Sequence, residues 1–263
     1  SSVLPDQSYL TGVNSAYNFI DLDGSNEYID CGDFDLASGG GNGQFTIMGY
    51  IKAESIGAWD TIVSKWNNSS VYREWLFRFN DASKIEFRLY DESADKTIGR
   101  YHNSALSTGT WYHYACTYDG STGSGCNDGV LIYQNGTRVD DADISGSDEA
   151  NFAGLENLAG SFQIGTLNDS GQTNFFDGLI SQIALWNKAL SASEVSAIYS
   201  LGRHGNLLDK YSDNLVGYYA MGALDASTGL KDVGNGTIYD RSGNSNHGTA
   251  TNTEAADLAS SPN

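Results

Sequence analysis

One loop near the end of the chain places oxygen-bearing side chains at alternate positions. Residues 240–246 read Asp-Arg-Ser-Gly-Asn-Ser-Asn, and the glycine allows a bend. Calcium takes roughly six to eight oxygen ligands, so the single carboxylate of this loop needs other acids or backbone carbonyls beside it. The loop is consistent with calcium or with an ordinary turn, because Asp, Asn and Gly also dominate turns. The candidate calcium ligands are Asp240, Ser242, Asn244, Asn246, Asp177 and Asp23.

A second set of candidates combines aromatic rings with amides and acids at strand ends and in loops. Sugar rings stack on aromatic faces, and Asn or Asp side chains bind sugar hydroxyls. Trp and Tyr also pack at sheet edges with no ligand involved, and that alternative applies to each ring. The candidate glycan-binding residues are Trp59, Trp66, Asn67, Tyr90, Tyr101, His102, Asn168 and Asp169.

Short alternating strands separated by turns position these residues. Asn135-Gly136 is a strong hairpin signal, and glycine rather than proline makes the turns, with 31 Gly beside two Pro. The spacing predicts an all-β, antiparallel β-sandwich with almost no helix. Alternation of side chains predicts strands at 45–52, 75–79, 85–89, 111–118 and 130–134.

The stretch from 175 to 202 contains a turn, a strand and the one convincing helix. Ser191 and Glu194 form a capping box, and Gly202 is placed to end a helix near 191–200. A helix this short must dock on a sheet to be stable. In the preceding strand, the residues expected to face the core together are Leu179, Ser181, Ile183 and Leu185.

Composition limits the classes of partner. The 263 residues are 40% apolar and carry a formal net charge of -19, which repels phosphate backbones and anionic lipid heads. No apolar run reaches the length of a membrane span, and the first residue is Ser, so we expect a fragment or a processed product. Nucleic acid and membrane insertion are therefore poor predictions, whereas cations and neutral sugars are better ones.

The cysteines are few and odd in number, which argues against a disulfide scaffold or a four-ligand zinc site. Cys116 and Cys126 flank a predicted hairpin loop and could pair across it; the alternative is buried or free thiols.

Several short motifs follow one another in order: I-V-S-K at Ile62, G-T-W-Y-H at Gly109, T-Y-D-G at Thr117, I-Y-Q-N-G at Ile132 and F-D-G at Phe176. With their flanking strands they extend from residue 17 to residue 201, and the set resembles laminin G-like domains of the concanavalin A-like jelly-roll superfamily. The resemblance implies a jelly-roll sandwich and calcium near the loop at 240. Where that family usually has Asp-Glu, this chain has Ser181-Gln182. Residues 73–77 and 89–93 further resemble versions found in marine bacteriophage structural proteins.

The C-terminal segment is placed unusually. In many relatives of this kind, the L-V-G-Y strand and the D-x-S-G-N loop precede the F-D-G hairpin, whereas here they follow the helix. They could begin a second domain, but the tail after them is far too short for one. We expect one domain over 1–263, with 214–250 folding back beside the N-terminal strands.

Catalytic patterns are missing from the sequence. Jelly-roll glucanases use a strand with the pattern E-x-D-x-x-E, which places two carboxylates on one face, and we find no such strand. Glu86 alternates with Arg88, which can pair with it. A Ser-centred nucleophile elbow is also missing. His113 lies within a predicted strand, where a structural role is more common.

These observations predict a non-catalytic adhesion or structural module at an extracellular or virion surface. Its expected partners are a neutral glycan or other surface or virion proteins, with Ca²⁺ as a candidate cofactor and a homo-oligomer as one form of assembly. The alternatives are a glycan-cleaving enzyme of the same fold and a purely structural oligomer, because fold does not determine function.

Overall fold

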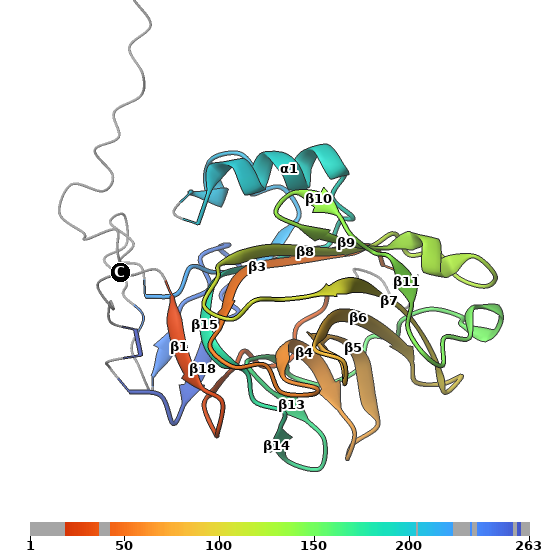
Figure 1. The fold of residues 1–263 in the computed structure, drawn as a ribbon, viewed down its shortest axis with the longest axis horizontal. Coiled ribbons are helices and arrows are strands. Elements are labelled where there is room, and N and C mark those ends of the chain that lie inside the picture. Colours follow the sequence, from red (N-terminus) through yellow and green to blue (C-terminus); the bar gives the residue numbers. More distant parts are fainter. Residues whose placement is uncertain are drawn as a thin grey trace, which may run out of the picture.

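A computed structural model describes residues 19–36, 43–203, 205–222, 232, 236–254 and 257–258. This described part consists of two β-sheets packed face to face, with one α-helix above them (Figure 1). Almost every strand pairs antiparallel with its neighbours. The predicted all-β jelly-roll sandwich is confirmed.

The first sheet contains the strand that precedes the helix. Within the described residues its order is β1 (Ile20–Asp23), β15 (Asp177–Trp186), β3 (Phe45–Ala53), β8 (Tyr112–Tyr118), β9 (Val130–Gln134) and β10 (Thr137–Arg138), with β16 (Leu215–Tyr219) also paired to β15.

The second sheet is larger and contains the long hairpins of the middle of the chain. Its order among the described residues is β11 (Ala142–Asp143), β7 (Lys96–Ala105), β6 (Lys84–Asp91), β5 (Tyr72–Phe79), β4 (Thr61–Asn67), β12 (Phe162–Ile164), β2 (Tyr28–Asp30), β18 (Gly248–Thr251) and β17 (Thr237–Ile238). The short strands β13 (Leu167–Asn168) and β14 (Gln172–Thr173) pair with each other, and β13 runs parallel to β4.

Aromatic side chains dominate the core between the sheets. The ring of Phe45 lies 5.9 Å from those of Trp75 and Phe87 and 6.0 Å from that of Tyr118. Trp75 in turn lies 5.7 Å from Phe162. These tilted and edge-on contacts join both sheets, and burial of the rings supplies much of the stability.

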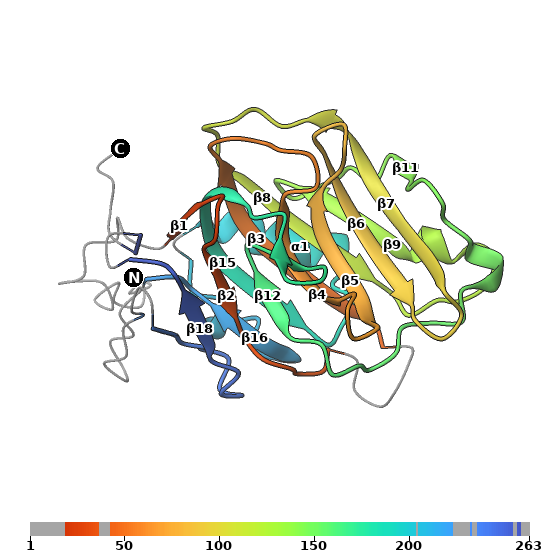
Figure 2. The same cartoon turned by 90° about the horizontal axis from the view of Figure 1, so that it is seen from below.

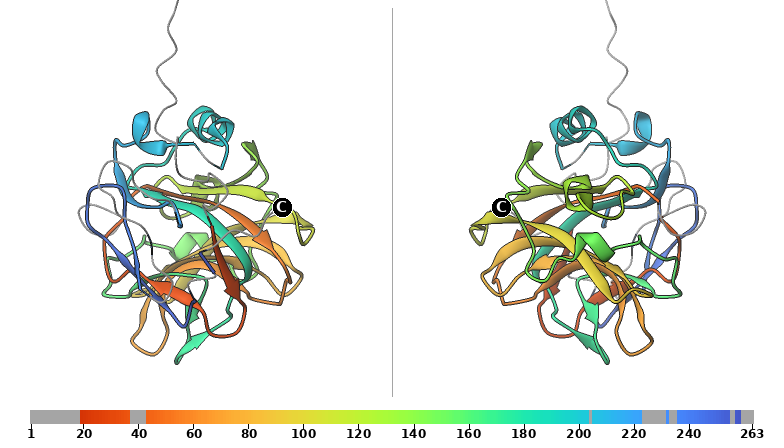
Figure 3. Two further views of the ribbon diagram at one scale, coloured as in Figure 1. Left: turned by 90° about the vertical axis from the view of Figure 1, so that its left-hand side faces the viewer. Right: turned by 90° about the vertical axis from the view of Figure 1, so that its right-hand side faces the viewer.

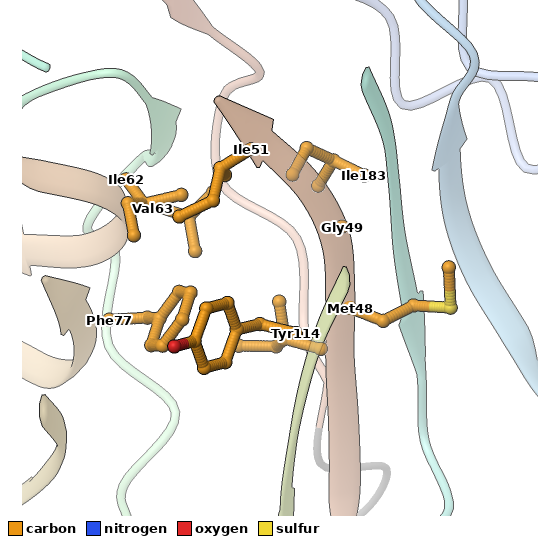
Figure 4. Close-up of a pocket in the computed structure, with 9 residues that line it drawn as sticks. Met48, Gly49, Ile51, Ile62, Val63, Phe77, Tyr114 and Ile183 are labelled. Atoms are coloured by element: carbon orange, nitrogen blue, oxygen red, sulfur yellow. The ribbon is translucent and has the colours of Figure 1, made fainter. Parts of the chain in front are cut away.

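One void between the two sheets is too small for a ligand. Val63, Phe77 and Tyr114 point toward one another across a gap, whereas Met48 points away from it (Figure 4). The gap measures about 10 Å³ and has apolar walls, which is the size of one water molecule at most. This void therefore cannot hold a sugar or another organic ligand.

Helix α1 (Ala192–Leu201) forms as the capping box predicts. Ser191 Oγ accepts from the Glu194 amide, the Glu194 carboxylate accepts from the Ser191 amide, and Gly202 caps the end with φ 72°. Val195 and Ile198 are buried against the first sheet. Short 3₁₀ turns also occur at η2 (Cys126–Gly129), η3 (Glu149–Asn151) and η4 (Leu207–Asp209).

The predicted core-facing set of β15 is wrong in its first half. Ile180, not Leu179, joins Ile183 and Leu185 in the core between the sheets. The cause is a β-bulge between Ser181 and Ala184, where Gln182 has φ 51°. The extra residue shifts the alternation by one position, so residues that would face the core before the bulge face outward instead.

The C-terminal segment contributes to both sheets. Strand β16 pairs with β15 through Tyr219 opposite Ile183, and β18 pairs with β2 through Ala250 opposite Ile29. This second pairing places the segment beside the N-terminal strands, as the bottom view shows (Figure 2).

Two smaller expectations concern cysteines and membranes. Cys31, Cys116 and Cys126 are all free and buried, so Cys116 and Cys126 do not form a disulfide. Burial raises the pKa of the Cys126 thiol to about 11, which keeps it protonated. Among the described residues, the model contains no helix with the length and apolar character needed to cross a membrane.

Candidate functional site

The two outer faces of the sandwich differ in what covers them. Helix α1 lies over the outer face of the first sheet, where Met48, Trp186 and Val195 share a buried cluster (Figures 1 and 3). The outer face of the second sheet, across β4 to β7, is turned toward the viewer in Figure 2. A ligand that binds to a sheet face therefore has the second sheet available.

Strand β6 shows how the sequence prepares this outer face. Ile85, Phe87 and Leu89 are fully buried in the core. Because side chains alternate along a strand, the intervening residues belong to the other side. These outward residues are Lys84, Glu86, Arg88 and Tyr90.

A cavity of about 590 Å³ opens on this face. The walls come from the loop before β4, the turn between β5 and β6, and the segment that includes β11. Its lining residues are Trp59, Asn80, Asp81, Ala82, Lys84, Glu86, Arg88, Tyr101, Asp143, Ile144 and Ser145. We call this cavity the groove. Its size suits a small ligand or part of a chain.

An arginine–glutamate–arginine network makes up the floor of the groove, where Glu86 and Arg88 line the cavity and Arg78 supports Glu86 from the neighbouring strand. Glu86 Oε1 accepts from Arg78 Nε and Nη2 at 3.2 and 3.1 Å, and from Arg88 Nε at 2.9 Å. Burial lowers the pKa of the Arg78 guanidinium, although Glu86 opposes the shift. Charged donors fixed in this way present N–H groups in set directions.

Trp59 stands at one wall of the groove in a strained backbone conformation. Its φ of 75° is rare for a bulky residue. Arg78 Cζ lies 4.3 Å from the centre of its ring, and Thr61 Oγ1 donates to its carbonyl at 3.0 Å. Strain of this kind persists only where surrounding contacts maintain it, and it is concentrated at functional sites.

Tyr101 lies in the same cross-strand row as the floor. Arg78 pairs with Glu86, and Glu86 pairs with Tyr101 on β7. Lys84 Nζ is 5.4 Å from the centre of the Tyr101 ring. The structure therefore brings two predicted glycan-binding residues, Trp59 and Tyr101, to one groove.

Trp66 and Tyr90 form a second aromatic cluster on the same sheet. Their ring centres are 5.3 Å apart and the rings are edge-on. Arg73 Cζ lies 4.1 Å above the Tyr90 ring, and its guanidinium is held by Glu92 through Nη2 at 2.6 Å. We call Trp66 and Tyr90 the distal platform.

The other predicted glycan-binding residues lie elsewhere. Asn67 and Asn168 face each other where β4 meets β13, and each amide oxygen accepts a local turn amide. Asp169 accepts from Asn68 Nδ2 at 2.7 Å. His102 is only 6% exposed and, as the neighbour of Tyr101 on β7, points away from the groove.

The loop at 240–246 uses its polar groups internally. The Asp240 carboxylate accepts from the amides of Tyr218, Ser242 and Asn246 at 2.9, 2.8 and 3.0 Å, and from Ser242 Oγ at 2.9 Å. The amide groups of Asn244 and Asn246 donate to carbonyls of β16. A carboxylate has about four lone-pair positions, so Asp240 has none left for calcium. Calcium binding at this loop would require some of these hydrogen bonds to be exchanged, and it stays a prediction.

Asp23 and Asp177 meet each other but not this loop. They face each other at the ends of β1 and β15, where Asp23 accepts from the amides of Ser25 and Asn26. The loop contacts Tyr218, opposite Ala184, seven residues along β15 from Asp177. At the rise of a strand that separation is about 23 Å. In the described ranges, no group of three or more His, Cys, Asp or Glu is arranged to hold a metal.

Sequence reasoning missed the basic floor of the groove. Arg78 and Lys84 were not candidates, and Glu86 with Arg88 was considered only as an ion pair. The alternation of β6 could have indicated Lys84, Glu86 and Arg88, because these charged residues alternate with apolar ones, whereas Arg78 lies on β5. Their convergence with Trp59 depends on the pairing of β5 with β6, which alternation alone does not give.

The sequence profile of the concanavalin A-like lectin/glucanase superfamily, in its laminin G-like form, matches residues 23–196. This is more than half of the chain and includes every residue of the groove. The chain belongs to this superfamily. A search of curated protein sequences gives no match for this superfamily member.

Solved structures similar to this lectin/glucanase-superfamily chain support the fold. A Bacteroides ovatus protein described as a candidate carbohydrate-binding protein has a TM-score of 0.60 and 22% identity, over 89% of this chain and 58% of that one. The heptameric SAP-like pentraxin of Limulus polyphemus has a TM-score of 0.50 and 16% identity, over 73% and 85%. The NanB sialidase of Streptococcus pneumoniae gives 0.52 and 18%, over 68% and 27%. The chain thus spans little more than half of the first of these proteins, and at such identities the likeness concerns the fold.

Proposed function

We propose that this chain is a non-catalytic, glycan-binding module and that the sugar binds in the groove on the second sheet. The observation that carries the proposal is Trp59, a half-buried ring held at φ 75° beside a polar floor. Its backbone strain has no structural benefit that a glycine would not supply more cheaply, whereas a fixed ring is useful for stacking on a sugar.

The floor complements the hydroxyl groups of a neutral sugar. Lys84 and Arg88 supply N–H donors, and Glu86 with Asp81 and Asp143 supplies acceptors. Sugar hydroxyls donate and accept, so they match a mixed floor. The net charge of -19 disfavours a polyanionic partner by long-range repulsion.

Binding rather than cleavage fits the groove acids. Glu86 is bound by two arginines, and Asp143 pairs with Arg100 at 2.5 Å. Glycosidases need one carboxylic acid as a proton donor and a second carboxylate beside it. The carbohydrate-binding description of the Bacteroides ovatus protein supports the same interpretation, whereas the family includes both lectins and glucanases. We place the module at an extracellular or virion surface, where repeated weak contacts add up.

A glycan array followed by titration calorimetry tests this proposal. We expect binding of a neutral glycan with a dissociation constant of roughly micromolar to millimolar, as a small, shallow contact gives. Trp59→Ala should weaken it. Trp111→Ala is the matched control. The Trp111 ring is also stacked with an arginine, since Arg203 Cζ lies 4.4 Å from its centre, but it packs against the buried cluster under α1 and not at the groove.

Three results would overturn the proposal. The first is that the wild-type chain binds no glycan. The second is that Trp59→Ala binds as well as wild type. The third is that Trp59→Ala and Trp111→Ala weaken binding equally. Release of sugar products from neutral polysaccharides would show that the module is catalytic.

A further inference from the structure

The groove and the distal platform lie along one strand face. Lys84, Glu86 and Arg88 line the groove, and Tyr90 is the next outward position of β6. Trp59 is at the level of Glu86, because it stacks on Arg78, the cross-strand partner of Glu86. Four residues of strand separate Glu86 from Tyr90, which is about 13 Å. That distance exceeds one sugar ring.

We propose that the ligand is a neutral, linear glycan chain that lies along β6, stacks one ring on Trp59 and stacks a later ring on the distal platform. This inference rests on the proposed function and adds the length and direction of the ligand. It contrasts with recognition of a single terminal sugar, for which Trp59 and the floor alone would suffice.

The middle of this path carries donors suited to the hydroxyls between the two stacked rings. Arg88 binds Glu86 through Nε, and within the described residues its terminal amino groups make no hydrogen bond. Arg88, which carries these groups, is the outward residue of β6 between Glu86 and Tyr90. A chain crossing from one platform to the other passes over them.

Charge favours a neutral chain over a polyanion. Arg78 and Arg88 share Glu86, and Arg73 beside the distal platform is neutralised by Glu92 with Asp95 3.6 Å away. The path is thus close to electrically balanced within a chain of net charge -19. Binding should therefore depend little on salt.

Affinity as a function of chain length is the decisive measurement. The probes are size-fractionated hydrolysates of cellulose, laminarin, mannan, xylan and arabinan, from disaccharide to hexasaccharide, with oligoalginate as the polyanion. Among the chains that bind, we expect the hexasaccharide to bind about tenfold more tightly than the disaccharide, as one further stacked ring would give. Doubling the salt should leave this affinity unchanged.

Variants locate the extra affinity. Trp66→Ala should remove the advantage of the hexasaccharide and leave disaccharide binding intact, whereas Trp59→Ala should weaken both. Tyr90→Phe keeps the ring and should behave as wild type; Tyr90→Ala should resemble Trp66→Ala. Trp111→Ala again serves as the control for a lost ring elsewhere.

The outcomes separate this inference from the proposed function. If disaccharide and hexasaccharide bind equally, or if Trp66→Ala keeps the length dependence, the extended path is wrong while glycan binding at Trp59 stands. If only oligoalginate binds, the neutral chain is wrong. If none of these chains binds, the inference is rejected, and the glycan array then decides the proposed function on its own.

Discussion

At the scale of single residues, Trp59 is unusual because its backbone is costly. An L-residue at φ 75° loses about 1 kcal/mol or more relative to glycine. We predict that Trp59→Gly is more stable than Trp59→Ala by about 1 kcal/mol, measured by urea denaturation. Trp66 supplies the control: it lies within β4 outside the positive-φ residues, and there glycine should be less stable than alanine. Equal stability of the two Trp59 variants would refute the strain.

The buried carboxyl of Glu27 should give the stability of the protein an unusual dependence on pH. Burial, with Asp257 and Asp23 nearby, raises its pKa from 4.5 to about 7. In the folded chain Glu27 therefore keeps its proton at pH values where the unfolded chain has already lost it. The free energy of unfolding consequently falls as pH rises from 4.5 to about 7. Glu27→Gln keeps an acceptor for the Asp23 amide and removes the titration. We predict that it stabilises the protein at pH 8 and not at pH 4.

Glu194 provides a control of opposite sign. The hydrogen bond from Lys188, together with the amide of Ser191, lowers its pKa to about 2. Its stabilisation is present above its ordinary pKa of 4.5 and is lost as pH falls toward 2. Glu194→Gln should therefore destabilise at pH 8. If Glu27→Gln also destabilises at pH 8, the raised pKa of Glu27 is wrong.

At the scale of elements, the loop at 240–246 acts as a hydrogen-bonded brace for β16. Asp240→Ala would leave the buried amide of Tyr218 without its acceptor. We predict a loss of about 2–3 kcal/mol in the free energy of unfolding, typical for bonds to a charged acceptor, measured by urea denaturation. Ser245→Ala, in the same loop, should have little effect.

Calcium distinguishes a brace from a metal site. Because the Asp240 oxygens are already used by four donors, millimolar calcium should leave the melting temperature of the wild type unchanged. A rise that disappears in Asp240→Ala would restore the calcium site that the loop pattern first indicated, since a ligand of the folded state stabilises it by mass action.

At the scale of the whole molecule, strands from both ends of the sequence complete the sheets. Removal of everything after Gly202 takes away β16 and β18, and with them Leu215 and Tyr218 of the cluster under α1. We predict that this truncation exposes the edges of β15 and β2 and gives an insoluble or strongly destabilised protein. A truncation after Leu258 keeps every described strand and is the control. A soluble 1–202 fragment with an unchanged melting temperature would contradict this prediction.

The sequence by itself determined the features whose signals are local. Alternation marked β6 and its neighbours, and Ser191 with Glu194 and Gly202 set the limits of α1, because partners within one turn or one strand are contiguous in sequence. The ordered motifs indicated the sandwich and the superfamily. They also placed Trp59, Tyr101, Trp66 and Tyr90 among the candidates.

Only the tertiary structure decided which of these residues act together. The bulge at Gln182 reversed the faces of β15, and the pairing of β5 with β6 brought Arg78 and Glu86 beneath Trp59. The loop at 240 resembles a metal site in sequence, yet its carboxylate accepts from the amide of Tyr218, twenty-two residues away on β16, as well as from donors of the loop itself. Register, bulges and long-range hydrogen bonds depend on partners distant in sequence, and local patterns contain no information about which partner is chosen.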